Sequence, residues 1–190
     1  MKKYMSILMM CARQSVYKLL AVLAVMLVWE WVLVFQAFGL GEIVYINVCA
    51  YVDFRGPFFC SWIAFMVILS KYGCKMRGPT GNLLRRLQVP GGKIFLLQGI
   101  YNFASFFILW GTQIMIYMAI ALVHFVRFPE RWGPQTLFIE IIDVFVFPSP
   151  AQLLIPLANL GKWIVVLGLI FISSLITSGI LCANRVEELV

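Results

Sequence analysis

Charged residues are scarce in this chain, and histidine is almost absent. Asp, Glu, Lys and Arg make up 12% of the 190 residues, whereas hydrophobic residues make up 63%. A soluble domain is about half apolar and about a quarter charged. A water-soluble fold of this length could not bury so much apolar surface, so we expect an all-α protein: a polytopic membrane helix bundle.

The motifs of several enzyme classes are also missing. One histidine, His124, and five scattered cysteines without a CxxC pair argue against a zinc site. No GxxxxGK[ST], HExxH or GxSxG segment occurs, so the chain is not expected to hydrolyse nucleotide alone. Quinone-linked disulfide oxidases have a similar length, but they need two cysteine pairs, and residues 129–161 contain no cysteine. We expect no enzymatic activity, no metal and no cofactor.

Acidic residues are absent from one strongly basic stretch, Lys71–Lys93. Its 23 residues hold six basic side chains: Lys71, Lys75, Arg77, Arg85, Arg86 and Lys93. Long apolar stretches flank it, and basic segments between membrane spans stay on the cytoplasmic side. The basic residues that give the chain its net charge of +7 are therefore expected to contact lipid head groups. We expect no nucleic-acid partner.

Long apolar stretches predict four transmembrane helices in one domain, 1–190. An amphipathic interfacial helix is expected first, over residues 1–18. The predicted membrane helices are residues 19–38, 58–76, 93–128 and 162–182. The third is expected to be one long helix, because no proline interrupts it and halves broken at residues 110–112 would be too short to span. The proline-rich outer region, 129–161, is expected to dip into the outer leaflet without crossing.

The distribution of basic residues predicts the orientation. Eleven Lys and Arg residues fall in the segments expected inside, and four fall in those expected outside. This bias favours a multi-pass protein of the cell membrane with both termini in the cytoplasm.

Glu30 is a carboxylate within the first predicted span. It lies 12 residues after Lys18, which places it about 18 Å into a hydrocarbon core of about 30 Å. A carboxylate at that depth is costly and usually faces a bundle interior or a water-filled cavity. It could contact a substrate or hold a proton. It could also be a neutral group hydrogen-bonded to a neighbouring helix, or lie at a shallower depth.

Polar residues form a stripe on the third predicted helix. Steps of four, three and seven residues place its members on one face: Gln98, Asn102, Ser105 and Thr112. The stripe could line a translocation pathway or join helices through hydrogen bonds. The fourth predicted helix carries a face of small residues that favours close packing, between helices or between protomers: Ser173, Ser174, Thr177 and Ser178.

A short amphipathic helix is expected inside the basic loop, over Thr80–Val89. Leucines form one face and arginines another, and the candidate contact residues are Asn82, Leu83, Leu84, Arg85, Arg86 and Leu87. Such a helix could dock on a cytoplasmic protein or lie on anionic membrane lipid.

Taken together, these features resemble a permease subunit of the type-2 ABC exporter family. The resemblance rests on the amphipathic N-terminus, the basic loop GCKMRGPTGNLLRRLQVPGGK and the proline-broken segment before the last span. It implies that Asn82–Val89 is a coupling helix for a separate cytoplasmic ATPase, that residues 137–160 are re-entrant, and that two permeases pair as a homo- or heterodimer. Family members usually have six spans, so the chain would be a short four-span variant. The alternative is a four-span accessory, immunity or sensor protein that transports nothing.

Overall fold

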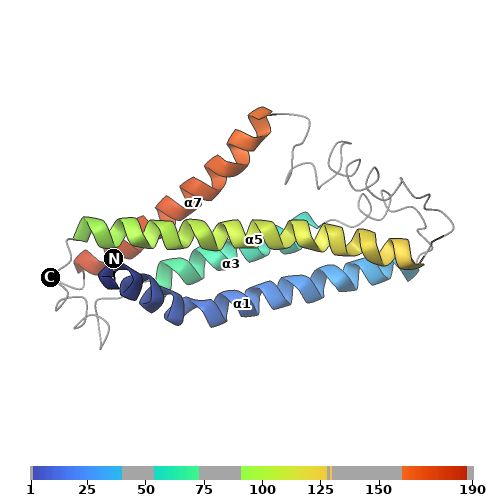
Figure 1. Cartoon of the computed structure of the whole chain (residues 1–190), viewed down its shortest axis with the longest axis horizontal. Coiled ribbons are helices and arrows are strands. Elements are labelled where there is room, and N and C mark those ends of the chain that lie inside the picture. Colours follow the sequence, from blue (N-terminus) through green and yellow to red (C-terminus); the bar gives the residue numbers. More distant parts are fainter. Residues whose placement is uncertain (1, 40–53, 73–90, 128, 130–159, 188–190) are drawn as a thin grey trace. The chain divides into compact units, whose positions relative to one another are not determined.

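The computed structural model describes residues 2–39, 54–72, 91–127, 129 and 160–187. Within these ranges the chain forms four α-helices and no β-strand (Figure 1). The helices are α1 (Lys2–Gly39), α3 (Arg55–Lys71), α5 (Gly91–Arg127) and α7 (Leu160–Glu187). The predicted all-α class is confirmed for the part of the chain that is described.

The first helix, α1, covers both the predicted interfacial helix and the predicted first span. Its 38 residues run without interruption from Lys2 to Gly39. No proline occurs in this stretch, and its only glycine is the final residue. Without proline or an internal glycine, the helix can continue from the predicted interfacial segment into the predicted span. Glycine is common at the end of a helix, which agrees with the end of α1 at Gly39.

The other helices differ from their predicted ranges mainly at their ends. Helix α3 begins at Arg55 and has 17 residues, a length of about 25 Å. Helix α5 is a single helix of 37 residues that continues through Trp110 and Gly111. Helix α7 has 28 residues and extends beyond the predicted range in both directions.

Three of the helices in the described ranges are long and apolar enough to cross a membrane. The candidate spans are Ala12–Gly39 in α1, Gly92–Arg127 in α5 and Trp163–Leu181 in α7. Helix α3 is shorter than each of these. The predicted re-entrant segment, 137–160, lies outside the described residues except for Leu160.

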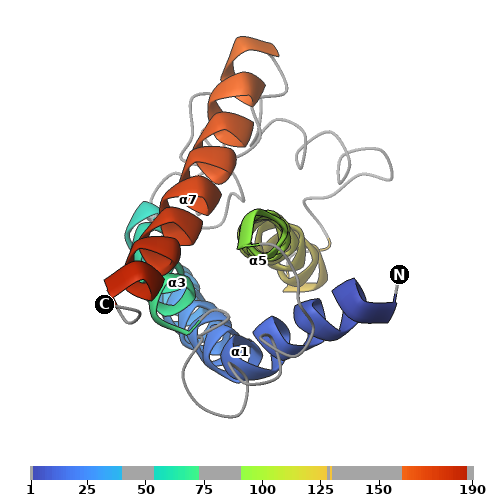
Figure 2. The ribbon, with the colours of Figure 1, turned by 90° about the vertical axis from the view of Figure 1, so that its left-hand side faces the viewer.

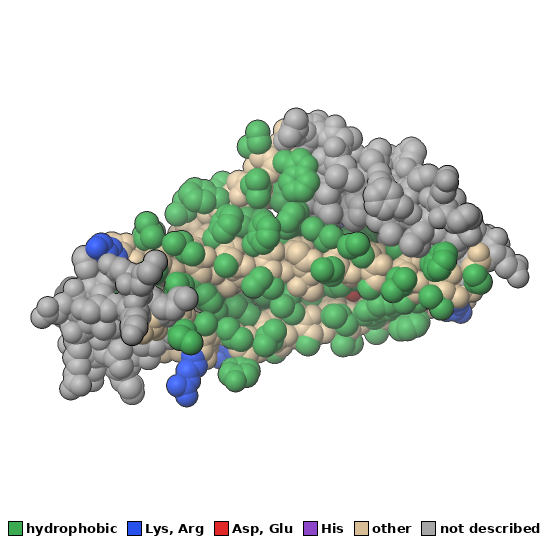
Figure 3. Space-filling view, viewed as in Figure 1, with side chains coloured by type: hydrophobic (Ala, Val, Ile, Leu, Met, Phe, Trp, Pro, Cys, Tyr) green, Lys and Arg blue, Asp and Glu red, His purple; other side chains and the backbone are tan. Residues whose placement is uncertain are grey.

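Large hydrophobic side chains occupy the exposed faces of the helices (Figure 3). On α1, for example, Val25, Val28, Val32 and Phe35 are each about half exposed or more. Soluble monomers rarely expose contiguous apolar patches of more than a few hundred Å². These faces suit contact with lipid, which agrees with the long apolar helices and supports the prediction of a membrane protein.

The helices contribute to two compact units. Unit 1 comprises Met1–Leu23, Ser61–Ile108 and Gly168–Val190, and unit 2 comprises Ala24–Cys60 and Leu109–Leu167. Figure 2 views the helices with the start of α5 toward the reader.

Unit 1 is held together by aromatic packing in its core and by a cation–π contact at its surface. The Phe106 ring lies 5.0 Å from the Trp62 ring and 6.2 Å from the Phe65 ring, measured between centroids. These contacts join α3 to α5. The Lys18 ammonium group lies 2.8 Å from the centroid of the Tyr72 ring, which joins α1 to the residue that follows α3.

The core of unit 2 is also rich in aromatic side chains. Tyr117 of α5 meets Phe54 edge to face at 5.1 Å between ring centroids. Trp110 of α5 meets Trp163 of α7 in the same way at 5.9 Å. Edge-to-face aromatic pairs contribute beyond the apolar area that they bury, so these contacts help to hold α5 against its neighbours within the unit.

Candidate functional site

Glu30 lies in the interior of unit 2, on the candidate membrane span of α1. Its side chain is fully buried, as is that of Gln113 on α5. The Gln113 Nε2 donates a hydrogen bond of 2.9 Å to Glu30 Oε2. The acidic residue singled out from the sequence is therefore held by a polar partner on a second candidate span.

The Glu30–Gln113 pair leaves two buried oxygen atoms without a donor. Neither Glu30 Oε1 nor Gln113 Oε1 has a hydrogen-bond partner among the described residues. Buried polar atoms are almost always hydrogen-bonded, because an unmet acceptor loses its contact with water and gains nothing in return. The Glu30–Gln113 pair therefore has two buried acceptor atoms whose hydrogen bonds are not satisfied.

Further side chains of unit 2 lie along α5 beyond Gln113. Tyr117 is fully buried and lies one helical turn beyond Gln113. Farther along α5, the His124 ring lies 6.1 Å from the Phe38 ring, and the Arg127 guanidinium lies 5.2 Å from the same ring. The basic group at the end of α5 thus has a cation–π partner on α1.

A second polar cluster lies in unit 1, between α5 and α7. Gln98 Nε2 donates to Asn102 Oδ1 at 2.7 Å. Asn102 Nδ2 in turn donates to Thr177 Oγ1 at 2.9 Å and to Ser178 Oγ at 3.0 Å. All four side chains are buried. The predicted polar stripe of α5 and the predicted small-residue face of α7 therefore meet, with Asn102 at the centre of their contacts.

The remaining two residues of the predicted stripe are Ser105 and Thr112. Ser105 is buried and donates to the carbonyl oxygen of Tyr101 in its own helix, at 2.9 Å. Thr112 is half-buried and belongs to unit 2, whereas Gln98, Asn102 and Ser105 belong to unit 1.

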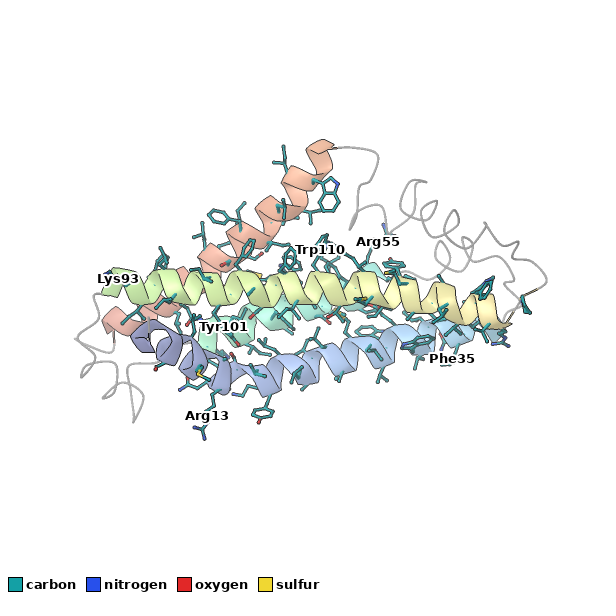
Figure 4. All side chains as sticks on the ribbon, viewed as in Figure 1. Arg13, Phe35, Arg55, Lys93, Tyr101 and Trp110 are labelled. Atoms are coloured by element: carbon teal, nitrogen blue, oxygen red, sulfur yellow. The ribbon has the colours of Figure 1, made fainter. Side chains whose placement is uncertain are left out.

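Further polar contacts in unit 1 involve residues that the sequence did not single out. The Tyr101 and Ser15 hydroxyl oxygens lie 2.6 Å apart, and Figure 4 shows Tyr101 on the side of α5 that faces α1. Trp62 Nε1 donates to Ser173 Oγ at 3.1 Å. Ser174 Oγ donates to the carbonyl oxygen of Gly99 at 2.7 Å. These bonds connect α5 with α1 and α7, and α3 with α7.

Gln113 is the main site residue that sequence reasoning missed. The predicted stripe stopped at Thr112, although Gln113 lies 11 residues after Asn102. Eleven residues are close to three full helical turns, so Gln113 shares the Asn102 face of α5. The residue spacing therefore placed Gln113 on the polar face of α5, but it did not indicate which helix Gln113 would contact.

The predicted coupling residues, Asn82–Leu87, lie outside the described residues. The described residues also contain no group of three or more His, Cys, Asp or Glu side chains that could hold a metal ion. Of the predicted pathway residues, Glu30 and Thr112 belong to unit 2, and Gln98, Asn102 and Ser105 belong to unit 1.

Comparison with known proteins gives no relative. No family model matches the chain, no curated protein matches it, and no solved structure matches its fold.

Proposed function

We propose that the protein is the membrane-embedded permease subunit of an ABC-type exporter, with a separate cytoplasmic ATPase as its partner. The observation that carries the proposal is the fully buried Glu30 within the candidate span of α1, bonded to Gln113 of α5. Ionisable residues at membrane depth are costly to keep and commonly mark substrate or ion pathways. Glu30 and Gln113 would form the polar contact of the transport pathway.

Four crossings are part of this proposal, with α3 as the additional span. Its 17 residues rise about 25 Å, slightly less than a hydrocarbon core of about 30 Å. Lys71 ends the helix, and its long side chain could reach the inner head groups while its aliphatic part stays in the apolar layer. Four crossings would put both termini and the basic loop on one side of the cell membrane, and the charge bias of eleven to four would make it the cytoplasmic side.

Coupling to the ATPase would occur through Asn82–Val89 in the basic loop. This segment combines leucines with Arg85 and Arg86. An acidic rim around an apolar groove on the ATPase would complement it. The proline-rich segment 137–160 would be re-entrant from the outer side, and two permeases would pair to complete the pathway.

A second candidate function is an accessory, immunity or sensor protein without transport activity. The contacts around Asn102 favour it, because buried amides and hydroxyls that bond to one another can serve helix association alone. In that case the α5 stripe would hold the bundle together and would line no pathway.

The permease and the accessory protein differ in whether an ATPase subunit co-purifies with the chain. The tagged full-length chain is purified in mild detergent from the cells that naturally produce it, and ATP hydrolysis is measured in the eluted sample. We expect vanadate-sensitive hydrolysis together with a second subunit that carries a phosphate-binding loop. Purified protein without hydrolysis and without such a subunit would contradict the permease proposal and leave the accessory function.

A further inference from the structure

The contact between Glu30 and Gln113 lacks one hydrogen that a second hydrogen bond between the two side chains would need. Gln113 Nε2 donates to Glu30 Oε2 at 2.9 Å, and the other two polar atoms of the pair, Glu30 Oε1 and Gln113 Oε1, have no donor among the described residues. An ionised carboxylate only accepts hydrogen bonds, and a carboxamide has one acceptor oxygen. Two oxygens cannot bond to each other unless one of them carries a hydrogen.

Rotation of the Gln113 amide does not remove this deficit. Turning the amide over exchanges its nitrogen and oxygen, which brings an acceptor oxygen to Glu30 Oε2 in place of the donor. The pair would then lose the bond to Glu30 Oε2 and gain at most one bond, from Gln113 Nε2 to Glu30 Oε1, so two facing oxygens would still have no hydrogen between them. One added hydrogen on the carboxyl group is required whichever way the amide faces.

We propose that Glu30 and Gln113 form a proton-binding site inside the membrane. The Glu30 carboxylate takes one proton from water onto Oε1, and the resulting O–H donates to Gln113 Oε1. Gln113 Nε2 continues to donate to Glu30 Oε2, so the neutral acid and the amide are joined by two hydrogen bonds. The site itself requires only the contacts described; the further step, that the proton is released during the transport cycle, rests on the proposed function.

A proton fits this position better than a larger cation. Both side chains are fully buried, so a metal ion or an organic ammonium group could enter only if α1 and α5 separated around the pair. A proton needs no such space, because it lies within a hydrogen bond. Protonation also removes the negative charge of Glu30, and an apolar interior favours the neutral form of the carboxyl group.

Among the side chains that the structure describes in unit 2, no other charge takes the place of the proton. Besides Glu30, the titratable side chains that the structure describes in this unit are Arg55, Cys60, Tyr117, His124 and Arg127, and Lys162 of α7 also belongs to the unit. Arg55 and Cys60 of α3 are exposed, whereas Glu30 is fully buried. His124 and Arg127 lie 11 and 14 residues beyond Gln113 on α5, or about 16 and 21 Å along the helix. Tyr117, one turn from Gln113, is neutral when protonated and supplies no positive charge.

Infrared spectroscopy of the full-length protein in lipid nanodiscs at pH 7 tests the site. A protonated carboxyl group has a carbonyl band that an ionised carboxylate lacks. We expect this band in the wild-type protein and its loss in Glu30→Gln. The matched control is Glu42→Gln, in the loop expected outside the membrane between the first two predicted spans, and it should retain the band. In Gln113→Leu the band should move to higher frequency, because the carbonyl group loses its hydrogen-bond donor. An absent wild-type band, or a band that Glu30→Gln leaves unchanged, would overturn the proposal.

Isotope labelling shows, without a variant that could fail to fold, whether the band comes from a glutamate. Glutamate labelled with ¹³C at the side-chain carboxyl should move the wild-type band to lower frequency, and an unmoved band would show that it comes from another group. Failure of the site and failure of the proposed function remain distinguishable. Without the band, Glu30 is ionised whatever its role in transport. With the band but with wild-type activity in Glu30→Gln, the proton is held for structure alone and the transport role fails.

Discussion

Asn102 on α5 donates a hydrogen bond of 2.9 Å to the Thr177 hydroxyl on α7, and both side chains are buried. The same amide nitrogen also donates to Ser178, while the Asn102 oxygen accepts from Gln98. Asn102 thus uses both ends of its carboxamide to connect the two helices. In an apolar environment such bonds hold helices together where the hydrophobic effect gives little preference for one partner over another.

Removal of this amide should weaken the packing of α5 against α7. Asn102→Leu keeps the size of the side chain but deletes the bonds to Thr177 and Ser178. At roughly 0.6–1.7 kcal/mol for each interhelical bond, the free energy of unfolding should fall by about 1–3 kcal/mol. Reversible unfolding of the purified protein in mixed micelles measures it.

Ser105→Ala is the matched control for that substitution. Ser105 is buried in the same stripe, but its hydroxyl donates to the Tyr101 carbonyl oxygen within α5. Its removal should change the free energy of unfolding by less than about 0.5 kcal/mol, since no bond between helices is lost. An equal loss of stability in the two variants would show that Asn102 does not join the helices.

Gln113→Leu should destabilise the protein by leaving the Glu30 carboxyl group without its partner. An unmet buried polar group costs about 1–3 kcal/mol, whereas replacement of both partners by apolar side chains can be nearly neutral. The double variant Glu30→Leu, Gln113→Leu should therefore be more stable than Gln113→Leu alone. A double-mutant cycle of unfolding measurements checks this, and additive effects of the two substitutions would exclude a coupled pair.

The orientation of the basic loop can be tested by cysteine labelling in sealed vesicles. In a background without the five native cysteines, Asn82→Cys should react with an impermeant reagent only from the cytoplasmic side. The charge bias of eleven to four is the reason. Asn47→Cys lies in the loop between the first two predicted spans, residues 39–57, which is expected outside, and it should react only from the opposite side. Labelling of the residue 82 cysteine from outside would contradict the topology.

Charge reversal in the basic loop should separate the chain from the proposed ATPase subunit. Arg85→Glu with Arg86→Glu should reduce the recovery of the ATPase subunit while the chain stays in the membrane, because two attractions to an acidic rim become repulsions. Lys2→Glu with Lys3→Glu makes the same change in net charge elsewhere on the inner side and should leave recovery intact. If neither pair affects recovery, the loop serves as a lipid anchor.

The helices were largely predictable from composition and from the positions of glycine and proline. Helix α5 could be foreseen because 36 residues from Lys93 to Phe128 contain no proline and few charges. The continuity of α1 was missed, because an amphipathic pattern over residues 1–18 shows which face is polar but not where a helix ends. In Figure 4, Arg13 on this segment points away from the other helices, as its polar side requires.

The contacts of the candidate site were less predictable than its residues. Glu30 stood out because a single carboxylate in an apolar stretch is a local property of the sequence. Its bond to Gln113 depends on how α1 and α5 are rotated about their axes, which residue spacing on either helix alone does not determine. The same applies to Asn102: its position on a polar face was readable, but its bonds to Thr177 and Ser178 required the packing of α7.

The central claim is that Glu30 works in transport, and its most direct test is ATP hydrolysis by the purified complex in lipid vesicles. Glu30→Gln keeps the shape and the hydrogen-bonding capacity of the side chain but cannot release a proton. At equal amounts of folded protein, we predict that this variant lowers hydrolysis by about tenfold or more, an increase in barrier of about 1.4 kcal/mol. The control Glu42→Gln should match the wild type. Wild-type hydrolysis in Glu30→Gln would contradict the claim and leave Glu30 a structural residue.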